Sequence, residues 1–211
     1  MKKLLALLFS LFLLGSPSVF AEDISDFEIE GISIGDSLLD YMTEDEILKE
    51  IEINKNINNN GHLKEPNKYS EAYLFNYSST YEAGLSFYVK NNSQNQYVSN
   101  KDEKYTILFI RGRIDYIEDF DSCITKRDEI VEILSGLFPN VQKIEKNWTY
   151  ELDPSGNSIM DDVVFAFDSK DKVKLRCSNW DENYRIKRNW SEGLNVVMQT
   201  KEIDEWMGDY K

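Results

Sequence analysis

The strongest constraint on the fold is a strict alternation of apolar and basic side chains near the carboxyl end of the chain. In the segment 171–178 the alternating residues are Val173, Leu175 and Cys177 on one side and Lys172, Lys174 and Arg176 on the other. A period of two is typical of a β-strand with one face in the core and the other toward solvent. This segment is therefore predicted to be a strand that buries Cys177 and presents its basic side chains outward.

Other segments with strand-like patterns are separated by turn residues and predict further strands. They are 69–77, 82–90, 105–110, 113–117, 141–152, 159–167 and 194–199. Residues 121–138 instead carry apolar residues at helical spacing, and the capping box of Thr43 and Glu46 predicts another helix. Runs of strands bracketed by helices predict an α+β fold with antiparallel meander sheets and helices packed on one face. The order of the predicted helices and strands along the chain also fits a unit of one helix and four strands that occurs twice, in the halves 22–120 and 121–211.

The amino-terminal 21 residues have the pattern of a cleaved signal peptide. Lys2 and Lys3 precede an apolar run over 4–14, and a small-residue cleavage pattern ends at Ala21. The alternative is a transmembrane anchor, but the apolar run is shorter than the ~20 residues that a membrane span needs. We therefore expect a single domain over 22–211, periplasmic or secreted, with no membrane anchor after cleavage.

Charge excludes several classes of partner. The 211 residues include 38 acidic and 24 basic ones, a net charge of −14, and loss of Lys2 and Lys3 with the signal peptide leaves −16. Binding of nucleic acid through phosphates requires a basic face, so no nucleic-acid partner is predicted. With one His and two Cys in the chain, no zinc site of the usual kind is expected. We predict neither a metal nor an organic cofactor.

The two cysteines are predicted to form a disulfide. Cys123 lies seven residues before Ile130 and so shares the inward face of the predicted helix, while Cys177 points inward from its strand. An exported protein meets an oxidising compartment, which favours a Cys123–Cys177 bond. Two unpaired buried thiols or a reactive cysteine are the alternatives, although no C-x-x-C pair or neighbouring base supports the latter.

No catalytic motif is present, and no catalytic residue is assigned. The single histidine, His62, lies in an Asn-rich segment and is interpreted as an exposed loop residue. Acidic neighbours at 161–162, 118–121 and 181–182 leave open an alternative function, a periplasmic hydrolase that uses paired carboxylates. The oxygen-rich segment 153–157 is interpreted as a hairpin turn, with adventitious calcium binding as the alternative.

Aromatic residues are the candidate binding surface. Trp180, Tyr184 and Trp190 lie in a predicted connection between strands, over 180–191. Such side chains anchor protein partners or stack on sugar rings, but they also cover sheet edges and complete cores. With no catalytic constellation in view, the sequence predicts an exported, non-enzymatic binding or accessory protein whose partner is an envelope protein or a glycan.

One short motif resembles known exported modules. Residues 32–39, Ile-Ser-Ile-Gly-Asp-Ser-Leu-Leu, are similar to the strand-Gly-helix opening of the outer-membrane assembly factor BamE and of the β-lactamase-inhibitor-protein fold. The wider pattern of a signal peptide, the segment 35–41, Leu194-Asn-Val-Val and Trp206 resembles a group of uncharacterised exported bacterial proteins. The resemblance implies a small exported module of the inhibitor type and no particular activity.

Overall fold

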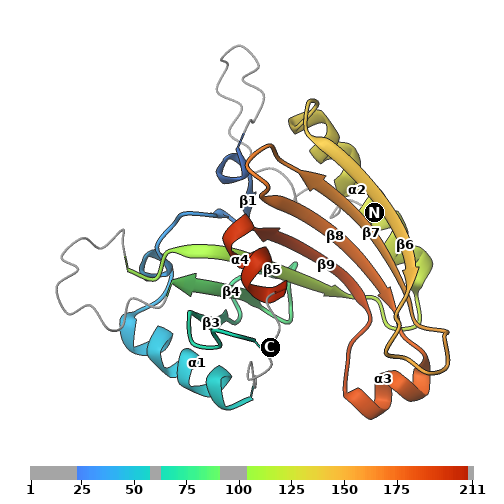
Figure 1. The fold of residues 1–211 in the computed structure, drawn as a ribbon, viewed down its shortest axis with the longest axis horizontal. Helices are drawn as coiled ribbons and strands as arrows, with labels where there is room; N and C mark the ends of the chain where they lie inside the picture. The colour runs from blue at the N-terminus through green and yellow to red at the C-terminus, as the bar shows by residue number, and fades with distance from the viewer. Residues whose placement is uncertain (1–22, 58–62, 91–103, 209–211) are drawn as a thin grey trace.

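The chain forms an α+β structure built on one seven-stranded antiparallel sheet (Figure 1). The computed structural model describes residues 23–57, 63–90 and 104–208. The predicted signal peptide and His62 lie outside these residues. The strands, in their spatial order, are β3 (Tyr69–Leu74), β4 (Leu85–Lys90), β5 (Ile107–Asp115), β9 (Gly193–Gln199), β8 (Lys172–Asn179), β7 (Ile159–Ala166) and β6 (Gln142–Thr149).

Two meanders meet at the centre of this sheet. Strands β3, β4 and β5 form the first, strands β6 to β9 form the second, and β5 pairs antiparallel with β9. Each meander follows a helix, which agrees with the predicted order of elements. The first has three strands among the described residues, whereas two separate strands had been expected over 105–117. These form the single strand β5, because Gly112 does not mark a turn: a Cβ there would lie 2.5 Å from the ring of Tyr81.

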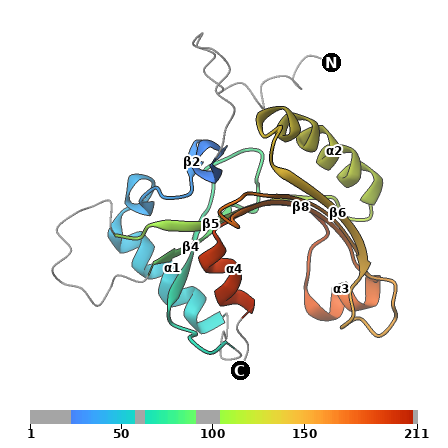
Figure 2. The same cartoon turned by 45° about the horizontal axis from the view of Figure 1, so that its top comes forward.

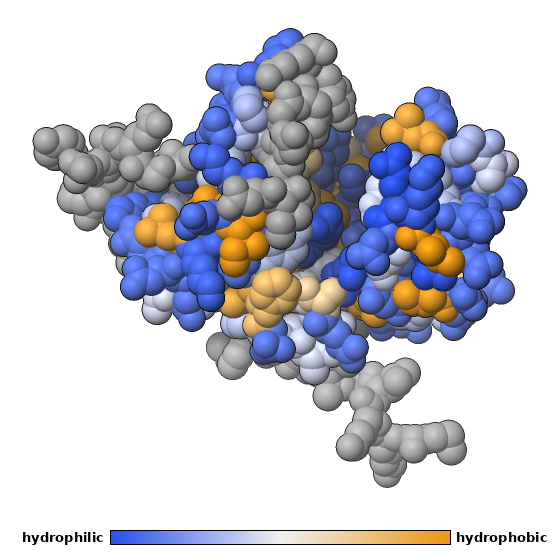
Figure 3. Space-filling model, turned by 90° about the horizontal axis from the view of Figure 1, so that it is seen from below, coloured by the Kyte–Doolittle hydropathy of each residue, from blue (hydrophilic) through white to orange (hydrophobic). Residues whose placement is uncertain are grey.

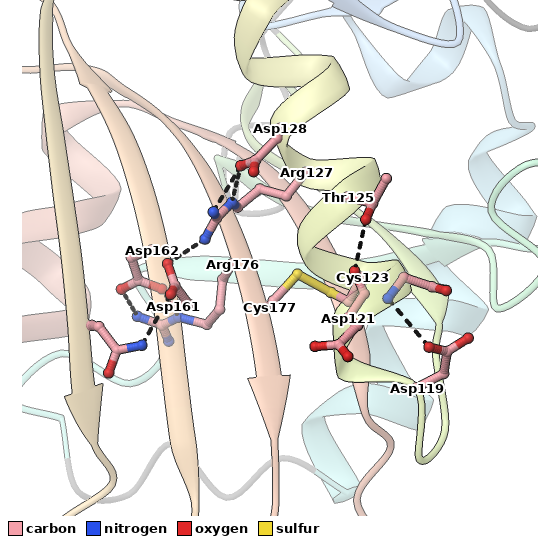
Figure 4. Close-up of a disulfide and its surroundings, with 12 residues drawn as sticks. Asp119, Asp121, Cys123, Thr125, Arg127, Asp128, Asp161, Asp162, Arg176 and Cys177 are labelled. Atoms are coloured by element: carbon pink, nitrogen blue, oxygen red, sulfur yellow. Dashed lines mark hydrogen bonds and ion pairs between the residues drawn. A yellow bond between two sulfur atoms is a disulfide. The ribbon is translucent and has the colours of Figure 1, made fainter.

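Helix α2 (Phe120–Leu137) covers one face of the sheet and contacts β8 and β9. Its Asp119 cap accepts a hydrogen bond from the Ser122 amide, so the helix begins at Phe120, one residue before the predicted range 121–138. The larger core lies between this helix and the sheet and includes fully buried Leu134. Cys123 of α2 and Cys177 of β8 form the predicted disulfide, with the two sulfur atoms 1.96 Å apart (Figure 4).

Helix α4 (Lys201–Gly208) lies on the opposite face, so helices cover parts of both faces. It buries Ile203 and Trp206 against Phe109 of β5 and Val197 of β9. The Trp206 indole N–H also donates a hydrogen bond to the Glu65 carbonyl over 2.7 Å. Figure 2 shows that the sheet is curved, with α2 on its convex side and α4 on its concave side.

The amino-terminal elements pack at two places, on β3 and near the carboxyl end of α2, where Phe27 contacts Phe138. They are the short 3-10 helices over Ile24–Asp26 and Leu38–Asp40, the hairpin of β1 (Glu28–Ile29) and β2 (Ile32–Ser33), and helix α1 (Glu44–Ile57). The predicted capping box begins α1, since Glu46 accepts hydrogen bonds from the amide and the hydroxyl of Thr43. Ser37 donates to the Lys104 carbonyl over 2.8 Å, and Leu38 is fully buried. The motif over 32–39 therefore fastens this segment to the start of β5.

Candidate functional site

The concave face of the sheet carries a band of polar and basic side chains between α4 and α3 (Glu182–Arg188). Directly paired residues of antiparallel strands point to the same face, so strand register identifies the side chains of this band. One row runs across the sheet through Tyr73, Ser86, Arg111, Val197, Lys174, Val164 and Ile144. The next row contains Arg113, Asn195, Arg176, Asp162 and Lys146. We call these two rows the groove face.

The surface is hollowed in this region. Figure 3 shows a depression between the side of the molecule that carries α1 and the side that carries α3. Within the groove face, Val197 and Asp162 are buried, whereas Lys174 and Val164 are partly exposed. Ile144, at the β6 end of its row, is 44% exposed. The groove face therefore combines a cationic middle with an apolar side chain open to solvent.

Arg176 and Asp162 form a bidentate ion pair on the groove face (Figure 4). The guanidinium donates to both carboxylate oxygens over 2.6 and 2.7 Å, and the Trp148 indole N–H donates to the same carboxylate over 3.1 Å. Burial alone would raise the pKa of Asp162, but the hydrogen bonds and charge of Arg176 outweigh it and the pKa is lowered. Asp162 therefore remains ionised and fixes Arg176, which also lies over the Trp148 ring.

Three further cations on this face have partners of their own. Arg113 lies 2.9 Å from the Asp115 carboxylate. Arg111 donates to the Tyr73 hydroxyl over 3.4 Å. Lys172, beside α4, pairs with Asp204 over 2.5 Å. Arg113 is thereby held within its own strand, Arg111 by β3 and Lys172 by α4.

Lys174 differs from these neighbours. Among the residues that the structure describes, its ammonium group makes no hydrogen bond or ion pair. Burial between Val197 and Val164 is the main cause that lowers its pKa to about 8, and the charge of Arg176 adds to it. The charges of Asp162 and Asp204 act in the opposite direction, but these two carboxylates pair with Arg176 and Lys172. A desolvated cation without a partner is costly, and such groups are concentrated at functional sites.

The predicted aromatic residues come together at one end of this face. Trp180 and Trp190 have ring centroids 4.6 Å apart, Tyr184 lies 5.7 Å from Trp190, and Tyr150 contacts all three rings. Tyr184 is buried, while the two tryptophans are partly exposed. We call these four residues the aromatic cluster. Its rings pack on one another and keep part of their surface open, and its role in binding stays a prediction.

Helix α3 holds the aromatic cluster in place, although the sequence had predicted an irregular connection there. Asp181 caps the helix by accepting from the Tyr184 amide, and Asn189 ends it in the left-handed conformation. Buried Glu192, which lies 4.0 Å from Arg185 of the helix, links it to the segments just after β5 and β8, because its carboxylate accepts from the amides of Glu118 and Trp180. The sequence signals for this helix are its two cap residues, Asp181 and Asn189, which flank the seven residues of α3.

The acidic neighbours named from the sequence do not converge. Asp161 faces α2, where it pairs with Arg127, whereas Asp162 faces the groove (Figure 4). Asp119 and Asp181 are occupied as helix caps. No group of three potential metal ligands occurs among the described residues.

The segment 153–157 forms a turn stabilised by its own side chains. The Asp153 carboxylate accepts hydrogen bonds from the amides and hydroxyls of Ser155 and Ser158. Desolvation works against ionisation of Asp153, but these hydrogen bonds outweigh it and lower the pKa to about 2. The side-chain oxygens of Asp153 and Ser155 are therefore engaged within the turn.

Comparison with known proteins adds no relative. No family model, curated protein or solved structure matches the chain. Across the described parts of the chain, no helix combines the length and the apolar character that crossing a membrane requires.

Proposed function

We propose that the protein is an exported, non-enzymatic binding or accessory protein of the bacterial cell envelope. The observation that carries this proposal is the groove face, a hollowed part of the sheet where apolar and cationic side chains remain partly open between α4 and α3. The centres of protein interfaces combine aromatic and arginine side chains in this way. The partner we favour is an envelope protein.

The structural disulfide supports export. Cys123 and Cys177 are both fully buried and bonded, which suits an oxidising compartment rather than the cytosol. The pattern of the first 21 residues agrees with this location. We therefore propose the periplasm as the site of action and release to the medium as the alternative.

Site-directed photo-crosslinking in the producing cell tests the binding function. A photoreactive amino acid replaces Ile144 in the groove face, and the matched control replaces Leu48 on α1, because both side chains are 44% exposed. We expect a discrete adduct from position 144 and none from position 48. Adducts of equal yield from both positions, or none from position 144, would contradict a specific partner on this face.

A further inference from the structure

We propose that Lys174 is the anchor for a carboxylate group supplied by an Asp or Glu side chain of a partner protein segment that enters the groove. This inference rests on the proposed binding function and names the chemistry of its ligand. The argument depends on the position of Lys174, the partners of its neighbours, and the side chains on either side of it.

Lys174 lies inside a row that ends in Tyr73 on β3 and in Ile144 on β6. In register across the sheet, Arg111 and Lys174 flank Val197, while Val164 and Ile144 continue the row toward β6. Directly opposed side chains are about 5 Å apart, so the two cations are separated by roughly 10 Å. A ligand in this row meets one central cation with apolar side chains on its β6 side.

Among the described residues, each carboxylate that acts on Lys174 is already paired with another cation. The cations around Lys174 are Lys172 and Arg176 on its own strand and Arg111 on β5. The carboxylates are Asp162 on β7 and Asp204 on α4. Asp162 is engaged by Arg176 and Asp204 by Lys172. A carboxylate brought by a ligand would therefore pair with Lys174 without displacing an existing ion pair. Arg176, two residues along the strand, would add to the attraction.

The class of ligand follows from the net charge of the chain, which acts at long range, and from the charge of Lys174, which acts at contact. The chain carries a net charge of −14, so a polyanion such as a nucleic acid is repelled at long range. A protein segment with one or two acidic side chains meets less repulsion, and at contact it gains a charge-assisted hydrogen bond from Lys174. Apolar residues next to the acid would cover Val164 and exposed Ile144. A small polar anion could not make those contacts.

Direct binding is tested with two short peptides. The probes are acetyl-Leu-Glu-Phe-amide and its Gln counterpart, titrated into the full mature chain with isotope-labelled isoleucine and valine methyl groups. We expect saturable shifts at Ile144 and Val164 with the Glu peptide, and roughly 10- to 100-fold weaker binding of the Gln peptide. Equal responses to the two peptides would overturn the assignment, and so would succinate binding as tightly as the Glu peptide.

Variants separate this inference from the proposed function. Lys174→Met should lose the response to the Glu peptide, whereas Lys143→Met should keep it, because Lys143 pairs with exposed Glu145 on the other side of the sheet. Thermal melting confirms that each variant is folded. In the crosslinking experiment, Lys174→Met should reduce the adduct at position 144 at least tenfold. An adduct that persists in this variant would refute the role of Lys174 but not the binding function. The absence of an adduct in the parent protein would refute both the binding function and the role of Lys174.

Discussion

Replacement of Lys174 by Met should make the protein more stable at neutral pH. The ammonium is desolvated between Val197 and Val164, has no ion pair among the described residues, and has its pKa lowered from 10.5 to about 8. Each pKa unit corresponds to ~1.4 kcal/mol, so the charged form costs at most ~3.5 kcal/mol in the folded state. Because the side chain is partly exposed, solvent screening reduces this, and we expect a gain of about 1 to 2 kcal/mol.

The sign of the pH dependence follows from proton binding. Below pH 8, Lys174 is protonated in both the folded and the unfolded chain, so the full cost is present. Between pH 8 and 10.5 the unfolded chain holds more protons on this group, so its contribution to the stability of the parent protein improves as pH rises. The advantage of Lys174→Met should therefore fall to less than half of its neutral value by about pH 9.5.

Urea unfolding followed by tryptophan fluorescence measures both quantities. The parent protein, Lys174→Met and the control Lys143→Met are compared at pH 7 and pH 9.5. The control side chain is exposed on β6, so its replacement should change the free energy of unfolding by less than ~0.5 kcal/mol. A Lys174→Met variant that is less stable at pH 7, or equally stabilised at both pH values, would refute the reasoning.

Three further predictions concern the supports of the fold. Reduction of the Cys123–Cys177 bond opens a loop of 54-residue separation and should lower the free energy of unfolding by up to ~4 kcal/mol, seen as a lower melting temperature; an unchanged melt after verified reduction would contradict this. Leu134→Ala should cost about 2 to 5 kcal/mol in urea unfolding, against less than ~0.5 for Ile186→Ala, since the former side chain is fully buried and the latter 64% exposed. Glu192→Ala should cost about 2 to 4 kcal/mol because two amides lose their acceptor, and a melt unchanged from the parent would show that water replaces the carboxylate.

Elements with a clear period were predicted closely from the sequence. Strand β8 spans Lys172–Asn179, and its alternation correctly placed Cys177 toward α2. The capping box of Thr43 and Glu46 likewise begins α1. In both cases the information is local, because side-chain period and cap chemistry act within a few residues.

The elements that were missed depend on contacts between distant residues. The sequence divides 105–117 into two strands on either side of Arg111 and Gly112, but Gly112 accommodates the ring of Tyr81 inside one continuous strand. Helix α3 is short and polar, and it is held by buried Glu192 from the following segment. The outward direction of Lys174 was predictable, but its lack of a partner was not, because that depends on Asp162 being paired with Arg176.

The disagreement between the overall charge and the local charge of the groove face has a physical consequence. At physiological ionic strength the field of the acidic chain is screened within about 8 Å, so it acts on the approach of a ligand more than on its bound state. Lys174, by contrast, lies in a partly desolvated row beside Arg176, where a contact pair is weakly screened. Higher salt should therefore speed the association of an acidic partner while weakening the bound pair much less. Such a surface favours ligands with one well-placed carboxylate over ligands with many.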